Sequence, residues 1–426
     1  MSDVKNIGNG ESEVVFGMLV RGLYLDVSGY SWTVIPDTGN GEVPQRALTV
    51  DIAPVLVNGA LNEEAAAKLF REALNAWKFD KAPAGVDAIL QSGHQVIAPS
   101  CVAICDRETL VGLYWIDRNL ESVRKRLKDR EDSYLEINPA EPVQVVNAAD
   151  RAAVVRNKIA LVTGGAQGIG EEIVRSLAAS GALVFIADLN LEGASQLADA
   201  INAGENRIAA LPVTVNVSDE ASVAAMFRTI ALTAGGLDLC ISNAGVLKAG
   251  SVLEQSLKDF QFTTDVNYTG FFLVAKYAGL LMRCQFRTAP NWKTDIIQIN
   301  SKSGLEGSRK NGAYAGGKFG GIGLVESFAL ELVEYNIKVN AVCPGNFLDG
   351  PLWSDPKKGL FVQYLDAGKV PGAKTVEDVR AFYEAKVPMK RGCTGADLSR
   401  AIYYLVEQEY ETGQAVPVTG GQTMLH

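Results

Sequence analysis

The chain has 426 residues, enough for two or three domains of ordinary size, so a single small module is excluded. Hydrophobic residues make up 47% and charged residues 21%, as in an average folded protein, which excludes a mostly disordered chain. The 40 Lys and Arg against 49 Asp and Glu leave a net charge of −9, which argues against binding of a nucleic-acid backbone by the chain as a whole.

Targeting and redox signals are weak. The chain has no apolar run of about 18 residues, and its start, MSDVKNIGNGESEVV, lacks the basic and then apolar pattern of a secretory signal. A cytoplasmic protein without membrane contact is therefore expected. The six cysteines lie mostly in apolar runs and are expected to be buried free thiols. Cys101 and Cys105 could be two ligands of a zinc ion, but the chain has only two histidines, His94 and His426, to complete such a site. No metal site is therefore expected.

Strand-like and helix-like patterns in residues 1–135 predict a small α/β or α+β domain. VVFGMLVRGLYLDV, residues 14–27, is typical of strand material broken by glycines. The following run predicts a helix that Asn62 caps, with an apolar stripe formed by Leu61, Ala65, Leu69, Ala73 and Trp77. Strands are expected near residues 95–105 and 110–116.

A charged helix is expected around RNLESVRKRLKDRED, residues 118–132, and its basic side chains are interpreted as a solvated face because acidic side chains alternate with them. The two prolines of EINPAEPVQ then interrupt all periodicity, so residues 136–157 are predicted to be a linker. The role of the N-terminal domain stays open among assembly, regulation and shaping of the substrate site.

From Lys158 onward, apolar strands alternate with amphipathic helices, which predicts a Rossmann-type, doubly wound parallel sheet over residues 158–426. The opening run IALVTGGAQGIG is a strand that ends in a glycine-rich turn before a helix. Glycines at 164, 168 and 170 allow the backbone to approach a pyrophosphate, which then lies at the amide-rich start of the helix.

The next strand, ALVFIA, ends in Asp188, where a dinucleotide fold places an acid that accepts hydrogen bonds from the adenosine ribose. A carboxylate there repels the 2′-phosphate of NADP, and neither the glycine-rich loop nor Leu189 offers a compensating cation. NAD is therefore the expected cofactor. An alternative role for Asp188, compatible with the first, is to cap the helix that follows.

Four residues predict the catalytic chemistry. Tyr314 and Lys318 lie four apart, so on a helix they share one face, where the ammonium is expected to lower the pKa of the phenol. Such a tyrosine exchanges a proton with a substrate hydroxyl during hydride transfer. Ser301, at the end of strand IIQIN, is placed to bind the substrate oxygen, and Asn267, early in a long apolar helix, to hold a water.

Residues from about 156 to 426 resemble the short-chain dehydrogenase/reductase family. The motifs that carry the resemblance occur in the family's order, namely TGGAQGIG, Asp188, SNAG at 242–245, Asn267, Ser301, Tyr314 with Lys318, VNAVCPG at 339–345 and TGQAVPVTGGQTM. The resemblance implies NAD(P)(H)-dependent interconversion of a secondary alcohol and a ketone by a tetrad of Asn267, Ser301, Tyr314 and Lys318. It also implies a homo-oligomer, a dimer or tetramer, built on the helices that carry Asn267 and Tyr314.

Together, these patterns predict one cofactor site. The residues expected there are Thr163, Gly164, Gln167, Gly168, Ile169, Gly170, Asp188, Leu189, Asn216, Val217, Asn243, Ala244, Gly245, Tyr314, Lys318, Pro344, Gly345 and Phe347. Two positions depart from the family pattern. Asn216 stands where many members have Asp, and Asp349 where many have a Thr that binds the nicotinamide amide, so the latter contact is in doubt.

A narrower set of segments, including IIQINSKSG, GNFLDGPLW and VPMKRGC, resembles the polyol-phosphate dehydrogenases of the family. This implies a small-molecule substrate, with sorbitol 6-phosphate and fructose 6-phosphate as the pair. The residues expected to hold its phosphate are Lys302, Arg309, Lys310, Lys390 and Arg391. The alternatives are an unphosphorylated polyol or other secondary alcohol as substrate, or an NAD-binding regulator without turnover.

The segment from about 346 to 392 is long for a connection and predicts a lid with its own helices. Its aromatic residues, Phe347, Trp353, Phe361 and Tyr364, either line the substrate pocket or pack the lid.

Overall fold

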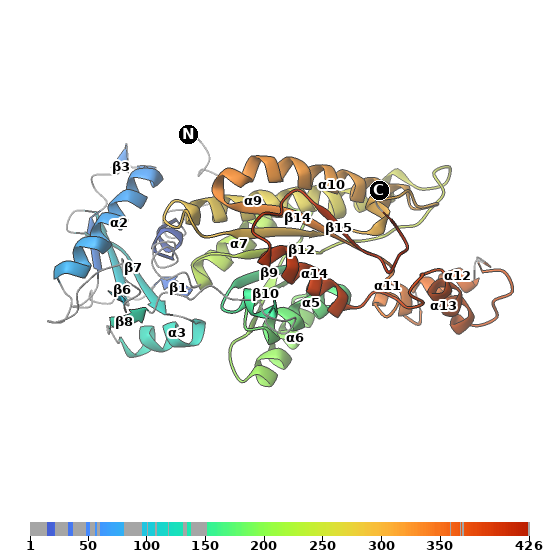
Figure 1. Ribbon diagram of the computed structural model, residues 1–426, viewed down its shortest axis with the longest axis horizontal. Helices are drawn as coiled ribbons and strands as arrows, with labels where there is room; N and C mark the ends of the chain where they lie inside the picture. Colours follow the sequence, from blue (N-terminus) through green and yellow to red (C-terminus); the bar gives the residue numbers. More distant parts are fainter. Residues whose placement is uncertain are drawn as a thin grey trace.

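The computed structural model describes residues 15–21, 33–36, 48–51, 56–57, 60–80, 96–99, 101–106, 109–117, 119–130, 134–137, 151–357, 359–366, 368 and 370–424. Two parts follow each other along the chain, an N-terminal part (the described residues up to 137) and a C-terminal part (151–424). They follow each other along the long axis of the molecule, and a group of short helices forms the end of the C-terminal part that lies farthest from the N-terminal part (Figure 1).

A seven-stranded parallel sheet forms the centre of the C-terminal part, in the order β11-β10-β9-β12-β13-β14-β15. Its strands are β9 (Ile159–Thr163), β10 (Leu183–Asp188), β11 (Ala210–Thr214), β12 (Leu239–Ser242), β13 (Thr294–Ile299), β14 (Ile337–Pro344) and β15 (Ala415–Val418). The central strands are buried along their whole length because helices cover both faces, which is why they are continuous apolar runs. The doubly wound sheet expected from the sequence is confirmed.

Two layers of helices enclose this sheet. One layer consists of α5 (Gly168–Ala179), α6 (Leu191–Glu205) and α14 (Gly395–Glu407), which pack on the core formed by Ile173, Leu398 and their neighbours. The other layer consists of α7 (Glu220–Ala234), α8 (Leu257–Thr264), the π-helical turn η4 (Asp265–Thr269), α9 (Gly270–Phe286) and α10 (Gly312–Leu332) (Figure 1). Short 3-10 turns are η3 (Ala152–Val155), η5 (Lys302–Gly304) and η6 (Val333–Tyr335).

The order of the strands reverses between β9 and β12, since β10 and β11 lie to one side of β9 and the later strands lie to the other. At such a switch point the loops after neighbouring strands diverge, and a crevice opens at their carboxyl ends. The glycine-rich loop after β9 and the SNAG segment after β12 therefore face the same crevice.

The predicted lid contains helices α11 (Pro351–Ser354), α12 (Leu360–Asp366) and α13 (Val376–Ala385). Trp353 lies at the centre of their small core, with ring centroids 5.2 Å from Phe361 and 4.9 Å from Tyr383. A capping box between Thr375 and Asp378 begins α13. The lid thus has a core of its own.

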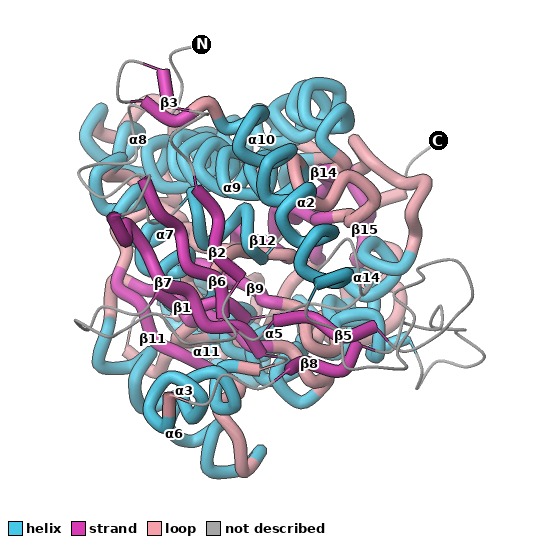
Figure 2. The backbone as a smooth tube through the Cα atoms, turned by 90° about the vertical axis from the view of Figure 1, so that its left-hand side faces the viewer, coloured by secondary structure: helices cyan, strands magenta, loops and turns pink. Residues whose placement is uncertain are grey.

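The N-terminal part contains a four-stranded mixed sheet in the order β1-β7-β6-β2, seen from that end of the molecule in Figure 2. Its elements are β1 (Thr33–Pro36), β2 (Leu48–Asp51), β3 (Leu56–Val57), β4 (Ala60–Leu61), α2 (Glu63–Asp80), β5 (Val96–Pro99), β6 (Cys101–Asp106), β7 (Thr109–Asp117), α3 (Leu120–Asp129) and β8 (Tyr134–Ile137). The strands predicted near residues 95–105 and 110–116 and both predicted helices are present. The Asn62 side chain accepts a hydrogen bond from the Ala65 amide at 3.1 Å.

Three predictions for this part were wrong in detail. Residues 15–21 of the predicted strand 14–27 form a helix, because their apolar side chains are all buried against the sheet rather than alternating between two faces. The stripe of α2 is rotated, so that Ala66, Ala67 and Phe70 are buried while Ala65, Leu69 and Ala73 are only partly so. The predicted linker begins inside β8, and residues 138–150 lie outside the described residues.

Candidate active site

A cleft with a volume of about 1670 Å³ lies at the carboxyl ends of the parallel strands. It is bounded by the glycine-rich loop, the loops after β10, β11, β12 and β13, the start of α10, and the lid. All predicted cofactor residues except Thr163 line it. Residues as far apart in the sequence as Gly164 and Gln422 are therefore brought to one surface.

The glycine-rich loop fits closely between its neighbours. Gly164 has a φ of +62°, and a Cβ atom there would lie 2.9 Å from the Cα of Ala244. A Cβ on Gly170 would lie 2.0 Å from the carbonyl oxygen of Gly164. Helix α5 begins after Gln167, whose side chain makes no capping hydrogen bond. The first amides of α5 are thus left for an anion, as a pyrophosphate site requires.

Thr163 is fully buried and does not itself line the cleft. Its hydroxyl accepts hydrogen bonds from the backbone amides of Asn243 at 3.0 Å and Ala244 at 3.1 Å. The Asn243 side chain in return donates to the carbonyl oxygens of Thr163 and Gly164. These bonds hold the ends of β9 and β12 together and fix the floor of the cleft.

Asp188 ends β10 at the rim of the cleft. Its carboxylate accepts hydrogen bonds from the amides of Ala166 at 3.1 Å and Asn190 at 3.0 Å. The cap of α6 is Asn190, which accepts from the Gly193 amide, so the capping role considered for Asp188 is wrong. Asn216 also lines the cleft, but its side-chain oxygen accepts from the amide and hydroxyl of Ser218, which commits it to its own turn.

Tyr314 and Lys318 lie on one face of α10, and both line the cleft beside Ser301. The Ser301 side chain hydrogen-bonds to Tyr314 and also caps η5, where it accepts from the Ser303 amide at 3.1 Å. The Lys318 ammonium donates to the Ile299 carbonyl oxygen at 2.8 Å and lies 5.7 Å from the centroid of the Tyr314 ring. The three side chains form one polar group at the ends of β13 and α10.

The protonation of this group follows from burial. Burial raises the pKa of Tyr314, and its hydrogen bond with Ser301 opposes that rise without cancelling it. Burial also lowers the pKa of Lys318 to about 8. The expectation that Lys318 lowers the pKa of Tyr314 is therefore not met in this structure, because burial is the largest influence on the phenol.

Asn267 lies in the π-helical turn η4, between α8 and α9, and not inside a regular helix. Its side-chain nitrogen donates to the carbonyl oxygens of Val246 and Thr263, and its oxygen accepts from the Val246 amide. It is 2% exposed. These bonds engage both amide hydrogens of the side chain and fix the loop that follows Gly245. The role of Asn267 in holding a water stays a prediction.

The predicted phosphate residues fall into two groups. Lys302, Arg309 and Lys310 line the cleft. Lys390 and Arg391 do not, because Lys390 donates to the Ala385 carbonyl and Arg391 forms a bidentate pair with Asp397. For these two residues the ordinary interpretation as local surface charge holds in this structure.

Two further cations line the cleft that sequence reasoning missed, Lys248 after β12 and Lys386 after α13. The Lys386 ammonium lies 4.2 Å from the Phe382 ring centroid, and in the described part of the chain no carboxylate pairs with it. Lys248 lies three positions after the SNAG segment. Because the loops after parallel strands line the cleft, this position in the sequence could have identified Lys248 as a cleft residue. No local signal distinguishes Lys386 from the other lid lysines.

The lid aromatics serve both of the roles considered. Phe347, Trp353 and Tyr364 line the cleft, whereas Phe361 is buried in the lid core. Asp349 does not line the cleft, since its carboxylate pairs with Arg380 of α13 at 2.7 Å. Asp349 therefore ties the loop after β14 to the lid.

The cleft fits a nicotinamide dinucleotide. The cradle at Gly164 and Gly170 has no space for a side chain, the start of α5 has free amides, and Asp188 stands where a ribose would lie.

Buried Cys240, Cys284, Cys343 and Cys393 are free thiols, as expected. His94, His426 and the side chains of Cys101 and Cys105 lie outside the description, and no group of three or more potential metal ligands occurs among the residues it covers.

None of the helices in the described ranges has both the length and the hydropathy needed to cross a membrane.

Comparisons with known proteins agree with this geometry. A model of the short chain dehydrogenase family matches residues 158–355. Sorbitol-6-phosphate 2-dehydrogenase of Escherichia coli (strain K12) is 37% identical over 271 residues, which are 63% of this chain and 99% of that protein. Trans-4-hydroxycyclohexanecarboxylate dehydrogenase of Sinomonas cyclohexanicum is 32% identical over 275 residues, which are 63% of this chain and 94% of that protein.

Among solved structures, the crystal structure of sorbitol-6-phosphate 2-dehydrogenase from Erwinia amylovora matches with a TM-score of 0.57 and 39% sequence identity. The match covers 62% of this chain and 100% of that one. The first 157 residues of this chain lie outside the family model.

Proposed function

Because the chain belongs to the short chain dehydrogenase family of nicotinamide-dependent oxidoreductases, we propose that it interconverts sorbitol 6-phosphate and fructose 6-phosphate with NAD. The observation that carries this proposal is the charge of the cleft. Besides Lys318, its cations are Lys248, Lys302, Arg309, Lys310 and Lys386, whereas the acids among its described lining residues are Asp188 and Asp355. A cleft so charged in a chain of net charge −9 favours an anionic substrate.

In the proposed reaction, Tyr314 is the acid/base that exchanges a proton with the substrate. The bound nicotinamide supplies a hydride acceptor for oxidation of the alcohol. Ser301 donates a hydrogen bond to the substrate oxygen, and the Tyr314 phenolate takes the hydroxyl proton as the ketone forms. The Lys318 ammonium lies 5.7 Å from the centroid of the Tyr314 ring, so its positive charge is near the side chain on which the phenolate charge develops.

NAD is proposed over NADP because of Asp188. Its carboxylate lies at the rim of the cleft, exposed Leu189 follows it, and no cation of the glycine-rich loop offsets its charge. A 2′-phosphate on the adenosine ribose would meet this negative charge.

The test compares initial rates with sorbitol 6-phosphate and with free sorbitol, each with NAD and with NADP, followed by absorbance of the reduced cofactor. We expect kcat/KM to be at least about 100-fold higher for the phosphate ester, since a charge-assisted pair contributes this order of discrimination. Equal values for the two substrates would contradict the phosphate assignment, and faster turnover with NADP would contradict the cofactor assignment.

A matched pair of variants locates the phosphate. Lys310→Gln removes a cation of the cleft, whereas Lys390→Gln removes a lysine that points away from it. We expect Lys310→Gln to raise KM for sorbitol 6-phosphate by roughly 10-fold and Lys390→Gln to leave KM unchanged.

The second candidate function is oxidation of an unphosphorylated secondary alcohol. It is favoured by the similarity to a dehydrogenase of a hydroxycyclohexane carboxylate, whose name contains no phosphate. A regulator without turnover is the third alternative, and measurable turnover of any secondary alcohol excludes it.

A further inference from the structure

The contact between the two parts of the chain is centred on a buried ion pair. Arg21, in the helix of residues 15–21, contacts Asp238 of the C-terminal part with 2.7 Å between Nη2 and Oδ2. Both side chains are 0% exposed. These residues are 217 positions apart, so the pair joins the two parts and not neighbouring segments.

Asp238 is also a central acceptor for the sheet. The oxygen that meets Arg21 accepts from the Ile159 amide at 2.8 Å, and the other accepts from the Trp292 indole nitrogen at 2.9 Å. The Lys158 ammonium lies 4.5 Å from the centroid of the Trp292 ring. Burial alone would raise the pKa of Asp238, but the charges of Arg21 and Lys158 and the hydrogen bonds from Ile159 and Arg21 together outweigh it, so the pKa lies below its ordinary value. The carboxylate is therefore charged, buried and dependent on cations.

The backbone around Asp238 is shaped to receive the N-terminal part. Gly235 has a φ of +80°, and a Cβ atom there would lie 2.7 Å from the Cβ of Val34 in β1. A Cβ on Gly236 would lie 3.0 Å from Nη1 of Arg21 and 2.1 Å from Oε1 of Gln285. Gln285 holds the other side of this loop, since its side chain bonds both backbone groups of Leu237. The loop thus lies between the N-terminal part and α9.

A second contact joins α2 to the end of α9. Arg71 donates to the Arg287 carbonyl oxygen at 2.8 Å, and the Arg287 side chain pairs with Glu63. One apolar cluster extends through both parts, from Val20, Phe70 and Trp115 to Phe227 and Ile296. The N-terminal part therefore shares a core with one helix layer of the C-terminal part.

The position of this contact bears on function. Ile159 begins β9 and Asp238 precedes β12, so the contact lies at the amino ends of the parallel strands. The cleft lies at their carboxyl ends, and no described residue of the N-terminal part lines it. In Figure 1 the N-terminal part and the lid lie at opposite ends of the molecule.

We infer that the N-terminal part is an intramolecular partner that stabilises the base of the dehydrogenase sheet by supplying Arg21 to Asp238, and that it does not shape the substrate cleft. Relatives that this chain covers over 99% of their length have only about 270 residues, so the partner is an addition to the common unit. Without Arg21, a buried carboxylate at the junction of β9 and β12 would lose its strongest cation. Breaking such a pair from one side costs far more than losing an exposed pair.

The first experiment compares Arg21→Met with Lys293→Met, which removes a cation from the exposed Lys293–Glu409 pair. In the full chain, we expect Arg21→Met to lower Tm by roughly 5–12 °C and Lys293→Met by less than about 3 °C. Equal shifts for the two variants would overturn the inference. The double variant Arg21→Met/Asp238→Asn removes both charges, and we expect it to recover more than half of the loss; a further fall would overturn it.

The second experiment uses the unmodified protein, so it does not depend on a variant that folds. Native-state hydrogen exchange compares amides of β6 and β7 with amides of β9 and β12. We expect equal free energies of opening in the slowest amides of both sheets, because a shared core unfolds as one unit. Opening of β6 and β7 at least about 100-fold more often than β9 and β12 would overturn the inference.

A third readout separates stabilisation from control of the cleft. Below its Tm, Arg21→Met is expected to keep kcat and KM within about twofold of the unmodified enzyme. A change in KM of about 10-fold or more, with the chain folded, would overturn the claim that the N-terminal part does not shape the cleft.

Discussion

At the residue scale, the arrangement of Tyr314, Ser301 and Lys318 depends on bonds to the backbone around it. Asn300 shows this, because its side chain donates to the Lys318 carbonyl and accepts from the Ser301 amide. A Cβ on Gly304 would lie 2.2 Å from the Asn300 oxygen, so this support has no space for a larger neighbour. Asn300 therefore positions two of the proposed catalytic residues, although the sequence pattern assigned it no role.

Replacing Tyr314 by Phe removes the proposed acid/base and leaves the shape of the side chain. We expect turnover to fall by roughly 100- to 10,000-fold, the usual contribution of general acid–base catalysis, while cofactor binding followed by protein fluorescence is kept. The control is Tyr404→Phe, which removes a hydroxyl that bonds Glu411 away from the cleft. Unchanged turnover in Tyr314→Phe would refute the assignment.

The raised pKa of Tyr314 predicts different pH profiles for the two directions. Alcohol oxidation needs the phenolate, so its kcat/KM is expected to rise from about pH 7 to pH 9 as the small phenolate fraction grows with pH. Ketone reduction needs the neutral phenol and is expected to stay level over the same range, because a phenol with a raised pKa stays protonated there. Loss of the Lys318 charge above its pKa of about 8 would flatten the oxidation profile at its upper end. An oxidation rate that falls from neutral pH upward would contradict this assignment.

At the element scale, the lid is a small folded unit attached to the sheet through the loop after β14. Its core around Trp353 and the Asp349–Arg380 pair hold α11, α12 and α13 together. Lys386, at the end of α13, is the cation that this unit brings to the cleft. The lid therefore contributes charge as well as cover to the proposed substrate site.

Replacing Lys386 by Gln tests whether the lid recognises the phosphate. We expect KM for sorbitol 6-phosphate to rise by roughly 10-fold and KM for an unphosphorylated alcohol to stay the same. Lys374→Gln is the control, since Lys374 is an exposed lysine of the same segment that does not line the cleft. Equal effects of Lys386→Gln on both substrates would indicate a packing role against Phe382 instead.

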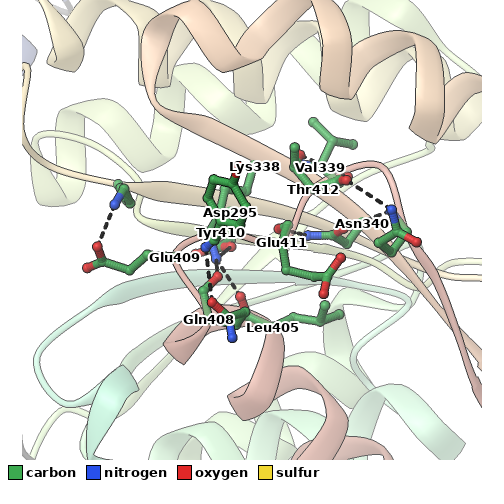
Figure 3. A network of polar contacts seen from close by, with 12 residues as sticks. Asp295, Lys338, Val339, Asn340, Leu405, Gln408, Glu409, Tyr410, Glu411 and Thr412 are labelled. Carbon is green, nitrogen blue, oxygen red and sulfur yellow. Dashed lines mark hydrogen bonds and ion pairs between the residues drawn. The ribbon is translucent and has the colours of Figure 1, made fainter.

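A polar network near the amino ends of β13 and β14 joins β14 to α14 (Figure 3). Lys338 pairs with Asp295 at 2.9 Å and donates to the carbonyl oxygens of Leu405 and Gln408 at the end of α14. Asn340 and Thr412 continue it along the loop after α14. These bonds satisfy helix-end carbonyls and place β15 beside β14, opposite to the cleft.

At the scale of the whole molecule, an apolar face remains exposed on α8, α9 and α10. The large apolar side chains there are Leu257, Phe260, Phe262, Phe272, Phe319, Leu330 and Val333, and Leu330 is 83% exposed. Several large apolar side chains exposed on neighbouring helices favour an interaction surface there. It coincides with the helices on which a homo-oligomer was expected.

Sedimentation velocity tests this expectation. The unmodified chain is expected to sediment as a dimer or tetramer, and Leu330→Glu to shift it toward a smaller species, because the new charge would be desolvated at the contact. Met389→Glu is the control, since Met389 is 69% exposed on another part of the surface. A monomeric unmodified chain, or an unchanged assembly of Leu330→Glu, would contradict the prediction.

The sequence by itself determined the local features of the C-terminal part. The glycine spacing after β9, the acid at the end of β10 and the four-residue step from Tyr314 to Lys318 depend on neighbours along the chain, and local geometry follows from them. The same local reasoning failed at residues 14–27, where burial on all sides made a short apolar run ambiguous between strand and helix.

Only the tertiary structure decided which cations reach the cleft and what the N-terminal part contacts. Lys386 and Lys390 are four positions apart, yet one lines the cleft and the other donates to a backbone carbonyl. Arg21 meets Asp238 across 217 positions. Such contacts depend on how distant elements pack, which periodicity and spacing along the chain do not predict. The physical reason is that a buried pair stabilises the protein only when both partners are in place.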